Sequence, residues 1–541
     1  MDTTYTFFAG LALAAASASA SAQQAPIVKE APLRAHLSFL ADDLLEGRGT
    51  GQRGGDLAVR YLETQAAAIG LKPLANGLYR QPVRFQGTKL VDGSAIRFAA
   101  GASTFTPRVG QDVLIGTGSG RAEVLLDAPL VFVGYGAIAP EEGWNDYKDV
   151  DVKGKILVMM VNDPQPTAEE PNRFAGKGYT YYGRWMYKYE EAVRRGAAGA
   201  LLIHTTPSAA YGWNVPSTSF ALERFHAPGG GNLLEGWLTE DFSRTLFKAA
   251  GFDLDTLRAA AERKDFRPLE LKIGAHAEIR SSVRQVEQFN VVGIVPGSDP
   301  KLRGQAVVYS AHWDHLGKVD GPADGTDRIY NGAIDNGSGA AALLAMAAAA
   351  VQKPAKRSQV FLWPAAEEVG MHGAQAYVAN PVFPLKDTLA DLNLDSMNFA
   401  GRTRDIGVAG AERSSLVDSA AKVAKQMGLK LAPPIPDLSG AYFRADHFQF
   451  AKAGVPAFNV GSAVFSGDGH FEFEHTHDVS AAKIVAFKDD YHRVSDQYHA
   501  SWDLSGMVQQ AQFTLNLGYE VANGKAMPSW KKGDPFSFIK R

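Results

Sequence analysis

The chain has 541 residues, 45% hydrophobic and 21% charged, with a formal net charge of −3. Such values are typical of a globular protein of more than one structural unit, and they exclude an intrinsically disordered chain and a strongly basic nucleic-acid-binding surface. Because cysteine is absent, disulfides and thiolate metal sites are excluded, so any metal site has to use histidine and carboxylate ligands.

Residues 1–22 resemble an export signal. A short apolar segment is followed by small residues and by "ASA" before Gln23, which predicts cleavage after Ala22 and a periplasmic or secreted protein. The apolar run is too short to span a bilayer, so no membrane anchor is expected. One departure from the usual pattern is that Asp2, and no lysine or arginine, precedes the apolar run.

Two helices and a β-rich unit are expected next. Apolar spacing predicts one helix before a glycine-rich break near residue 50 and a second that ends at Gly70. We assign residues 26–110 to the first part of a main domain. Residues 111–275 contain short β-type runs, "LVFVGYGA", "GKILVMMVND" and "GALLIHTT", and helices in "YKYEEAVRRGAAG" and "LTEDFSRTLFKAAG", which predicts a small inserted β-rich domain.

The main domain resumes over residues 276–541 with a different pattern. Four apolar runs, "QAVVYSAH", "SQVFLWPA", "LADLNLD" and "VPAFNVG", alternate with polar loops and usually with helices. This alternation predicts an α/β fold with a largely parallel or mixed sheet flanked by helices. In such sheets ligands bind at the carboxyl ends of the strands.

Polar residues with metal-binding chemistry follow these strands. His312 and Asp314 come after the first run, Glu367 and Glu368 after the second, and Asp395 ends the third. Asp335 lies in a turn of glycine and asparagine before an alanine-rich helix, and His492 lies in a loop before the final helix.

Each residue also has an ordinary interpretation. Asp335 could cap the alanine-rich helix, the two glutamates could start a helix, and the histidines could be solvated. Together, however, five nitrogen and oxygen donors at neighbouring strand ends suit two zinc-class ions that share a carboxylate. The five are His312, Asp335, Glu368, Asp395 and His492.

The segments "SAHWDHLG", "AIDNGSG", "AAEEVGMHGA", "NLDSMN" and "YHRVSDQYHASWDLSG" occur in this order. They closely resemble the co-catalytic dizinc peptidases of the M28 type, which include bacterial leucyl aminopeptidases, over most of residues 285–520. Two departures lie beside the motifs. "GMHGAQ" follows the glutamates in place of the more usual Gly-Leu-x-Gly-Ser run, and Ala445 stands where many relatives have serine.

The resemblance implies a zinc-dependent exopeptidase fold with two Zn²⁺ ions and assigns a role to each motif residue. It places His312 and Asp395 on one zinc, Glu368 and His492 on the other, and Asp335 between them. Glu367 is then the general base, and Asp314 orients His312. It further implies that residues 111–275 are a protease-associated insertion.

The expected activity is hydrolysis of peptides with a free N-terminus by a metal-activated water, with no nucleic-acid or membrane partner. Three alternatives stay open. A carboxypeptidase would need a cationic pocket, for which Arg402, Arg404, Arg444 and Arg493 are candidates. A glutaminyl cyclase on this scaffold would work with one zinc, and a non-catalytic binding protein would not need both glutamates. The sequence does not predict the oligomeric state or the preferred side chain.

Overall fold

A computed structural model describes residues 25–209, 211–227, 230–322, 324–438, 440–461, 472–474 and 489–541. The predicted export signal, residues 1–22, lies outside the described residues. In the described part of the chain, strands from both halves join one 14-stranded sheet, whose central path runs β20-β17-β13-β16-β12-β5-β8-β9-β11-β4. The predicted α/β fold class with a mixed sheet is confirmed.

The main unit is built on the four predicted strands. They are β13 (Ala306–Ser310), β16 (Ser358–Trp363), β17 (Thr388–Asn393) and β20 (Ala457–Asn459). Strand β13 is parallel to both β16 and β17, and β17 is parallel to β20. Every residue of these strands is buried, as expected where helices cover both faces.

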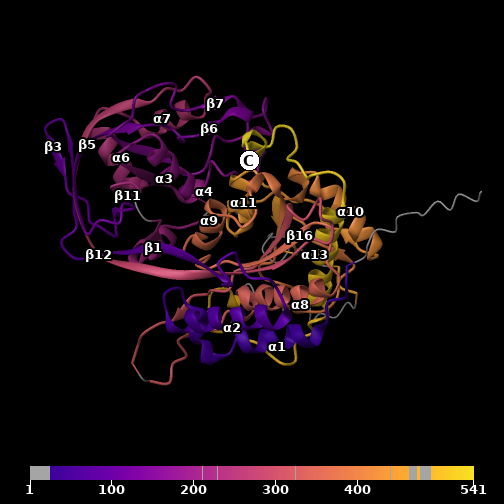
Figure 1. Cartoon of the computed structure of the whole chain (residues 1–541). Helices are drawn as coiled ribbons and strands as arrows, with labels where there is room; N and C mark the ends of the chain where they lie inside the picture. Colours follow the sequence, from indigo (N-terminus) through magenta and orange to yellow (C-terminus); the bar gives the residue numbers. More distant parts are fainter. Residues whose placement is uncertain are drawn as a thin grey trace, which may run out of the picture.

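Helices cover this sheet on its two sides. Figure 1 shows α1, α2 and α8 together on one side of the long strand β12, with α9 and α11 on the other. The helices of the main unit are α1 (Glu30–Leu40), α2 (Arg53–Ile69), α8 (Gly339–Gln352), α9 (His372–Ala379), α10 (Leu416–Gln426), α11 (His447–Lys452) and α13 (Ser505–Asn523). Helix α2 ends at Gly70, as predicted, where a φ of 91° suits a residue without Cβ.

Strand β12 (Leu269–Val295) belongs to both halves of the molecule. Its first part pairs with β2 (Ala95–Ala100) and β5 (Glu123–Phe132), and its last residues pair with β16. Between these parts, residues 281–291 of β12 pair with the whole length of β1 (Arg80–Leu90). The boundary expected at residues 275 and 276 therefore falls within a continuous strand.

The second unit has hydrophobic cores of its own, formed by residues between Ile96 and Ile279. Its remaining strands on the main path are β4 (Val113–Gly116), β8 (Ile156–Met160), β9 (Gly199–His204) and β11 (Leu234–Thr239). Its helices are α3 (Trp185–Arg194), α4 (Thr206–Ala209), α5 (Asn214–Ala221), α6 (Glu240–Ala249) and α7 (Leu254–Ala261), and short strands β3 (Ser103–Phe105) and β10 (Arg224–His226) pair at its edges. The predicted insertion, residues 111–275, lies within this unit, and its protease-associated identity stays a prediction.

The most apolar helical segment is part of the core. Residues Ala333–Gln352 have a mean hydropathy of 1.3, enough to cross a membrane by length and composition, but 89% of that segment is buried inside the protein. Its burial by α1, α2 and α13 accounts for the composition.

Candidate metal centre and cleft

Three parallel strands bring the predicted ligands to one edge of the sheet. His312 and Asp314 follow β13, Glu367 and Glu368 follow β16, and Asp395 follows β17. Because β13 lies between β16 and β17 and is parallel to both, the segments that follow the three strands leave the sheet side by side. The predicted convergence is therefore present among the described residues.

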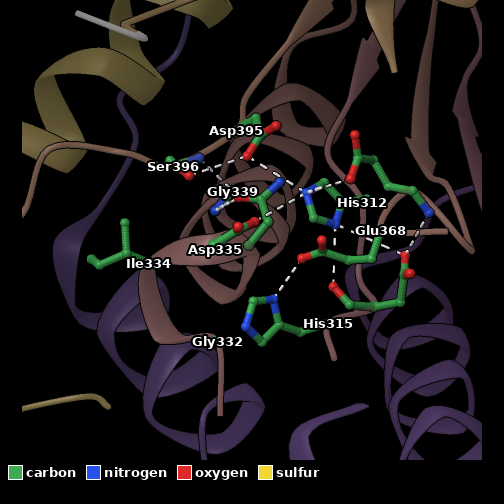
Figure 2. A network of polar contacts seen from close by, with 12 residues as sticks. His312, His315, Gly332, Ile334, Asp335, Gly339, Glu368, Asp395 and Ser396 are labelled. Atoms are coloured by element: carbon green, nitrogen blue, oxygen red, sulfur yellow. Dashed lines mark hydrogen bonds and ion pairs between the residues drawn. The ribbon is translucent and has the colours of Figure 1, made fainter. Parts of the chain in front are cut away.

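The residue Asp335 links two clusters of ligand atoms. His312 Nε2 lies 3.4 Å from Asp335 Oδ1 and 3.5 Å from Asp395 Oδ1. The other oxygen of the same carboxylate, Oδ2, lies 3.1 Å from His492 Nε2, which is also 3.1 Å from Glu368 Oε2. Figure 2 shows His312 pointing toward Asp335 and Asp395 at one end of this network.

These separations suit zinc ligands. With zinc–ligand bonds of about 2.0–2.1 Å and tetrahedral angles, two ligand atoms on one ion lie about 3.3 Å apart. In addition, His312 Nε2 is buried and has no hydrogen-bond partner within the described structure. A buried imidazole nitrogen without a partner is costly, and a metal bond would satisfy it. The donor set therefore fits two zinc-class ions, one on each side of Asp335.

A further histidine, His315, joins the second cluster. His315, Asp335, Glu368 and His492 each offer a ligand atom within 4.8 Å of the others. His315 Nδ1 lies 2.6 Å from Glu368 Oε1, and Figure 2 shows the ring pointing at this carboxylate. His315 was not among the ligands predicted from the sequence, although its position three residues after His312 was a visible signal.

The environment separates the two adjacent glutamates. Burial raises the pKa of Glu367 well above its usual range, and the neighbouring Glu368 adds to the effect. Burial and Asp335 act on Glu368 in the same direction, but the positive charges of His492 and His315 outweigh them and lower its pKa to about 2. Two carboxyl groups whose pKa values are shifted in opposite directions are suited to two different roles.

Asp314 contacts both His312 and the glutamate loop. His312 Nδ1 lies 3.2 Å from the carbonyl oxygen of Asp314 and 3.9 Å from its carboxylate oxygen Oδ1. The carboxylate accepts hydrogen bonds from the Glu367 amide, at 3.1 Å, and from the Thr50 hydroxyl, at 3.0 Å. Asp314 is thus placed to fix the imidazole through its main chain and the position of Glu367 through its side chain.

Two residues that support the site were not predicted. Arg48 is fully buried and donates hydrogen bonds to the carbonyl oxygens of Trp313, Leu40, Asn331 and Gly332. Of these acceptors, Trp313 adjoins His312 in one loop, and Asn331 and Gly332 come shortly before Asp335 in another.

The second support is Asp496, whose carboxylate accepts hydrogen bonds from the amides of Ile334 and Asp335. Burial raises the pKa of Asp496 to about 6. The acceptors of Arg48 and the donors to Asp496 are main-chain groups, which carry no side-chain signature in the sequence.

Left-handed backbone conformations cluster at the same place. Ala366, Ser396 and His492 have φ values of 58°, 59° and 57°. Each is a candidate ligand or the neighbour of one of the acidic residues. For residues other than glycine such conformations cost about 1 kcal/mol or more, and they persist where function fixes the geometry.

A cleft of about 1090 Å³ opens over the candidate centre. Its inner end is lined by Asp335, Glu367 and Asp395. The facing wall includes Phe174 and residues 178–182 of the second unit, and residues 407–410, 431–437 and 441–445, with Ala445 among them, line other parts of the cleft. His372, in the other departure from the family pattern, is half-buried and stacks on Phe85, and neither residue lines the cleft.

The four arginines proposed for a carboxylate pocket are not equivalent. Arg402 pairs with Glu474, and Arg404 donates to the Glu474 carbonyl oxygen. Arg493 is exposed and does not line the cleft. Arg444 alone of the four lines it.

Comparisons with known proteins agree with these motifs. Residues 290–515 match the model of peptidase family M28. Leucine aminopeptidase 1 of Ajellomyces capsulatus is 25% identical over 275 residues, which are 48% of this chain and 63% of that protein. Leucine aminopeptidase 1 of Paracoccidioides brasiliensis is 27% identical over 278 residues, or 47% of this chain and 60% of that protein. The chain thus spans under two thirds of the length of the curated relatives it matches.

Two solved structures are also similar. An aminopeptidase from Aneurinibacillus sp. strain AM-1 gives a TM-score of 0.49 at 17% identity, with 92% of this chain and 95% of that chain covered. A zinc aminopeptidase from Bacillus subtilis gives a TM-score of 0.44 at 19% identity, with 95% and 99% covered.

Proposed function

We propose that this chain, whose residues 290–515 match the model of peptidase family M28, is a zinc-dependent aminopeptidase that binds two ions. The observation that carries the proposal is the division of the Asp335 carboxylate between His312 on one side and His492 on the other. The relatives named as leucine aminopeptidases and the family match support the reaction class.

The ligand roles follow the two clusters. His312 and Asp395 would hold one zinc, Glu368 and His492 the other, with Asp335 bridging and His315 as an additional group beside Glu368. Two zinc ions bound here would lower the pKa of a water to about 7 and polarise the peptide carbonyl.

The residue Glu367 is suited to move the proton. Its carboxylate oxygen Oε2 lies 4.0 Å from His312 Nε2, and its amide is held by Asp314. General-base action needs the ionised form of Glu367. Positive charge beside this buried carboxyl group, such as that of bound zinc, would favour the ionised form. Glu367 would then take a proton from the attacking water and return it to the leaving amine.

The inner end of the cleft favours a free amino terminus. Asp335, Glu367 and Asp395 line it, so an α-ammonium group would be attracted there, while acetylation would remove the charge and add bulk. Val408, Leu431, Pro434 and Ile435 line the cleft farther along, which suits an apolar side chain.

The test uses blocked and unblocked substrates with zinc-loaded protein. Leucyl p-nitroanilide and unblocked short peptides should be cleaved, and N-acetylated versions should be at least ~10²-fold poorer, because the acidic end of the cleft would lose its partner. Equal rates for free and acetylated peptides would contradict the aminopeptidase proposal. A glutaminyl cyclase would instead convert N-terminal glutamine, and a binding protein would show no turnover.

Export is a separate proposal that depends on residues 1–22. Fractionation of the producing cells, with N-terminal sequencing of the product, checks it. A cytoplasmic protein that keeps Met1 would contradict it.

A further inference from the structure

The part of the cleft wall formed by residues 178–182, which we call the wall segment, is attached to the main unit at two points. The amide of Tyr179 donates a hydrogen bond of 2.6 Å to the carbonyl oxygen of Asp437, which itself lines the cleft. The ring of Tyr181 packs edge-on against Phe448 of α11, with ring centroids 4.9 Å apart. The segment is therefore held on either side of Thr180, which also lines the cleft.

Tyr181 packs against the hydrophobic cores of both units. In the second unit its ring lies 5.0 Å from that of Tyr187 in α3, and in the main unit it lies 6.2 Å from the ring of Phe443, in addition to its contact with Phe448. Edge-to-face pairs are favourable because the positive edge of one ring meets the negative face of the other. The Tyr181 ring therefore anchors the wall segment in the main unit.

A partly buried ion pair between the two units lies beside this ring. Lys452 Nζ, at the end of α11, lies 2.8 Å from Glu190 Oε1 in α3, and the Tyr181 hydroxyl donates to the other oxygen of the same carboxylate. The Lys452 ammonium group also lies 5.5 Å from the centre of the Tyr181 ring and 5.6 Å from that of Phe448, within the range of cation–π attraction. The Lys452 and Glu190 side chains are 24% and 30% exposed, so solvent screens this pair less than a surface pair.

The ion pair stabilises the wall without forming part of it. Lys452 and Glu190 do not line the cleft, whereas Tyr181 does. Burial raises the pKa of Glu190, but the charge of Lys452 outweighs this effect and keeps the pKa below its usual value. The carboxylate is therefore ionised at neutral pH, and the pair is intact there.

The size of the cleft limits what it can hold while the wall stays in place. Its volume of about 1090 Å³ is at the upper end of pockets that bind one drug-sized molecule. A peptide of few residues fits such a volume, whereas a longer chain needs the wall segment to move away from Asp437. The contacts that hold this segment therefore control the length of peptide that can enter.

We propose that Tyr181, Glu190 and Lys452 form a latch that holds the wall segment in place and restricts the cleft to peptides of few residues. The proposal rests on the proposed aminopeptidase function and deepens it, because it names the substrate class. Units that meet through a small number of side-chain contacts move relative to each other when those contacts are lost. Breaking the latch would therefore open the wall, while the candidate metal ligands, which all belong to the main unit, would stay in place.

Variants of Lys452 break the latch without changing a residue that lines the cleft. Lys452→Glu places two carboxylates side by side, Lys452→Met removes only the positive charge, and Lys452→Arg keeps the charge and should retain the latch. Lys422→Glu is the matched control, because Lys422 Nζ lies 2.6 Å from Glu520 Oε1 and this ion pair joins α10 and α13 within the main unit.

Two measurements are made on the zinc-loaded full chain. The first is kcat/KM for leucyl-alanine amide and for a ten-residue peptide that begins with the same two residues. We expect Lys452→Glu to raise the ratio of long to short peptide at least about tenfold, chiefly through a lower KM for the long peptide, whereas Lys452→Arg and Lys422→Glu should keep the wild-type ratio. The second is hydrogen exchange over residues 174–184, which should be faster in Lys452→Glu because the Tyr179 amide would lose its bond to Asp437.

The outcomes separate the latch from the proposed activity. Unchanged hydrogen exchange in Lys452→Glu would show that there is no latch, and faster exchange with an unchanged ratio would show that the latch does not restrict peptide length. Either result overturns the proposal even where the wild-type protein cleaves leucyl peptides. Should Lys452→Glu not fold, Lys452→Met decides by the same criteria, with a smaller effect expected in the same direction.

A wild-type protein that cleaves neither peptide would contradict the aminopeptidase function alone. Calorimetric titration with the two peptides then replaces the rates. Tighter binding of the short peptide to the wild type, lost in Lys452→Glu together with faster exchange over residues 174–184, would support the latch. Equal binding of the two peptides to the wild type, or no binding of either, would overturn it.

Discussion

Replacing Arg48 tests whether a buried cation organises the loops of the candidate centre. Its guanidinium group is fully buried and donates to four carbonyl oxygens, on Leu40, Trp313, Asn331 and Gly332. Burial lowers the pKa of Arg48 to about 10, while nearby carboxylates favour its charge. It is therefore still protonated at neutral pH.

The magnitude follows from those four acceptors. Arg48→Met would leave four carbonyl oxygens without this donor, and each buried unsatisfied group costs about 1–3 kcal/mol. Methionine avoids the desolvation of a buried cation, which offsets part of the loss. We expect the free energy of unfolding to fall by about 3–5 kcal/mol, and metal affinity to fall as well, because Trp313 and Gly332 flank the ligand loops.

Urea unfolding of the metal-free protein measures the first effect, and metal content after dialysis measures the second. Arg53→Met is a matched control, since the Arg53 side chain is 70% exposed and lies 3.7 Å from Glu46, and it should change stability by less than about 0.5 kcal/mol. Arg48→Lys keeps the charge but not the fork of donors, so its loss should be intermediate. A loss in Arg48→Met no larger than that in Arg53→Met would refute the reasoning.

Three further predictions concern the metals, the glutamates and a buried acid. Elemental analysis should find two zinc ions per chain, and chelation should abolish activity until divalent metal is restored; at most one ion after reconstitution would contradict this. Glu367→Gln should retain both metals yet lose about 10²–10⁴ in turnover, whereas Glu368→Gln should weaken metal binding; equal metal loss would show that the roles are wrongly divided. Burial raises the pKa of Asp391 from 3.8 to about 8, so its contribution to stability is fully present below pH 3.8 and is lost as the pH rises through about 8. The urea midpoint should therefore fall less between pH 5 and pH 9 in Asp391→Asn than in the wild type. An equal fall in both proteins would show that Asp391 does not cause this loss of stability.

The candidate ligands could be predicted from the sequence where they directly follow a buried strand. The runs before His312, Glu367 and Asp395 contain mainly apolar residues, and in the structure they are the fully buried strands β13, β16 and β17. Once such strands are parallel, the residues that follow them have to meet at one edge of the sheet. The convergence of the candidate ligands could therefore be predicted without knowledge of any side-chain contact.

Supports that act through the main chain could not be predicted in this way. Arg48 stands in a glycine-rich segment, "EGRGTG", and its acceptors include carbonyl oxygens more than 250 positions along the chain. Carbonyl groups are present at every residue, so nothing in the sequence marks those of Trp313 or Asn331.

The shared strand affects how the second unit can influence the reaction. Because β12 pairs with β5 at one end and with β16 at the other, removing residues 111–275 would cut a strand that also borders the main sheet. The second unit also contacts the main unit through Lys452 Nζ, which lies 2.8 Å from Glu190 Oε1. The candidate ligands, however, all come from the main unit, while Tyr179 and Tyr181 come from the other. Substitutions in the wall of the cleft that the second unit contributes would therefore affect peptide binding without altering the groups that would hold the metals. Point variants, rather than excision, can separate an effect on peptide binding from an effect on metal binding.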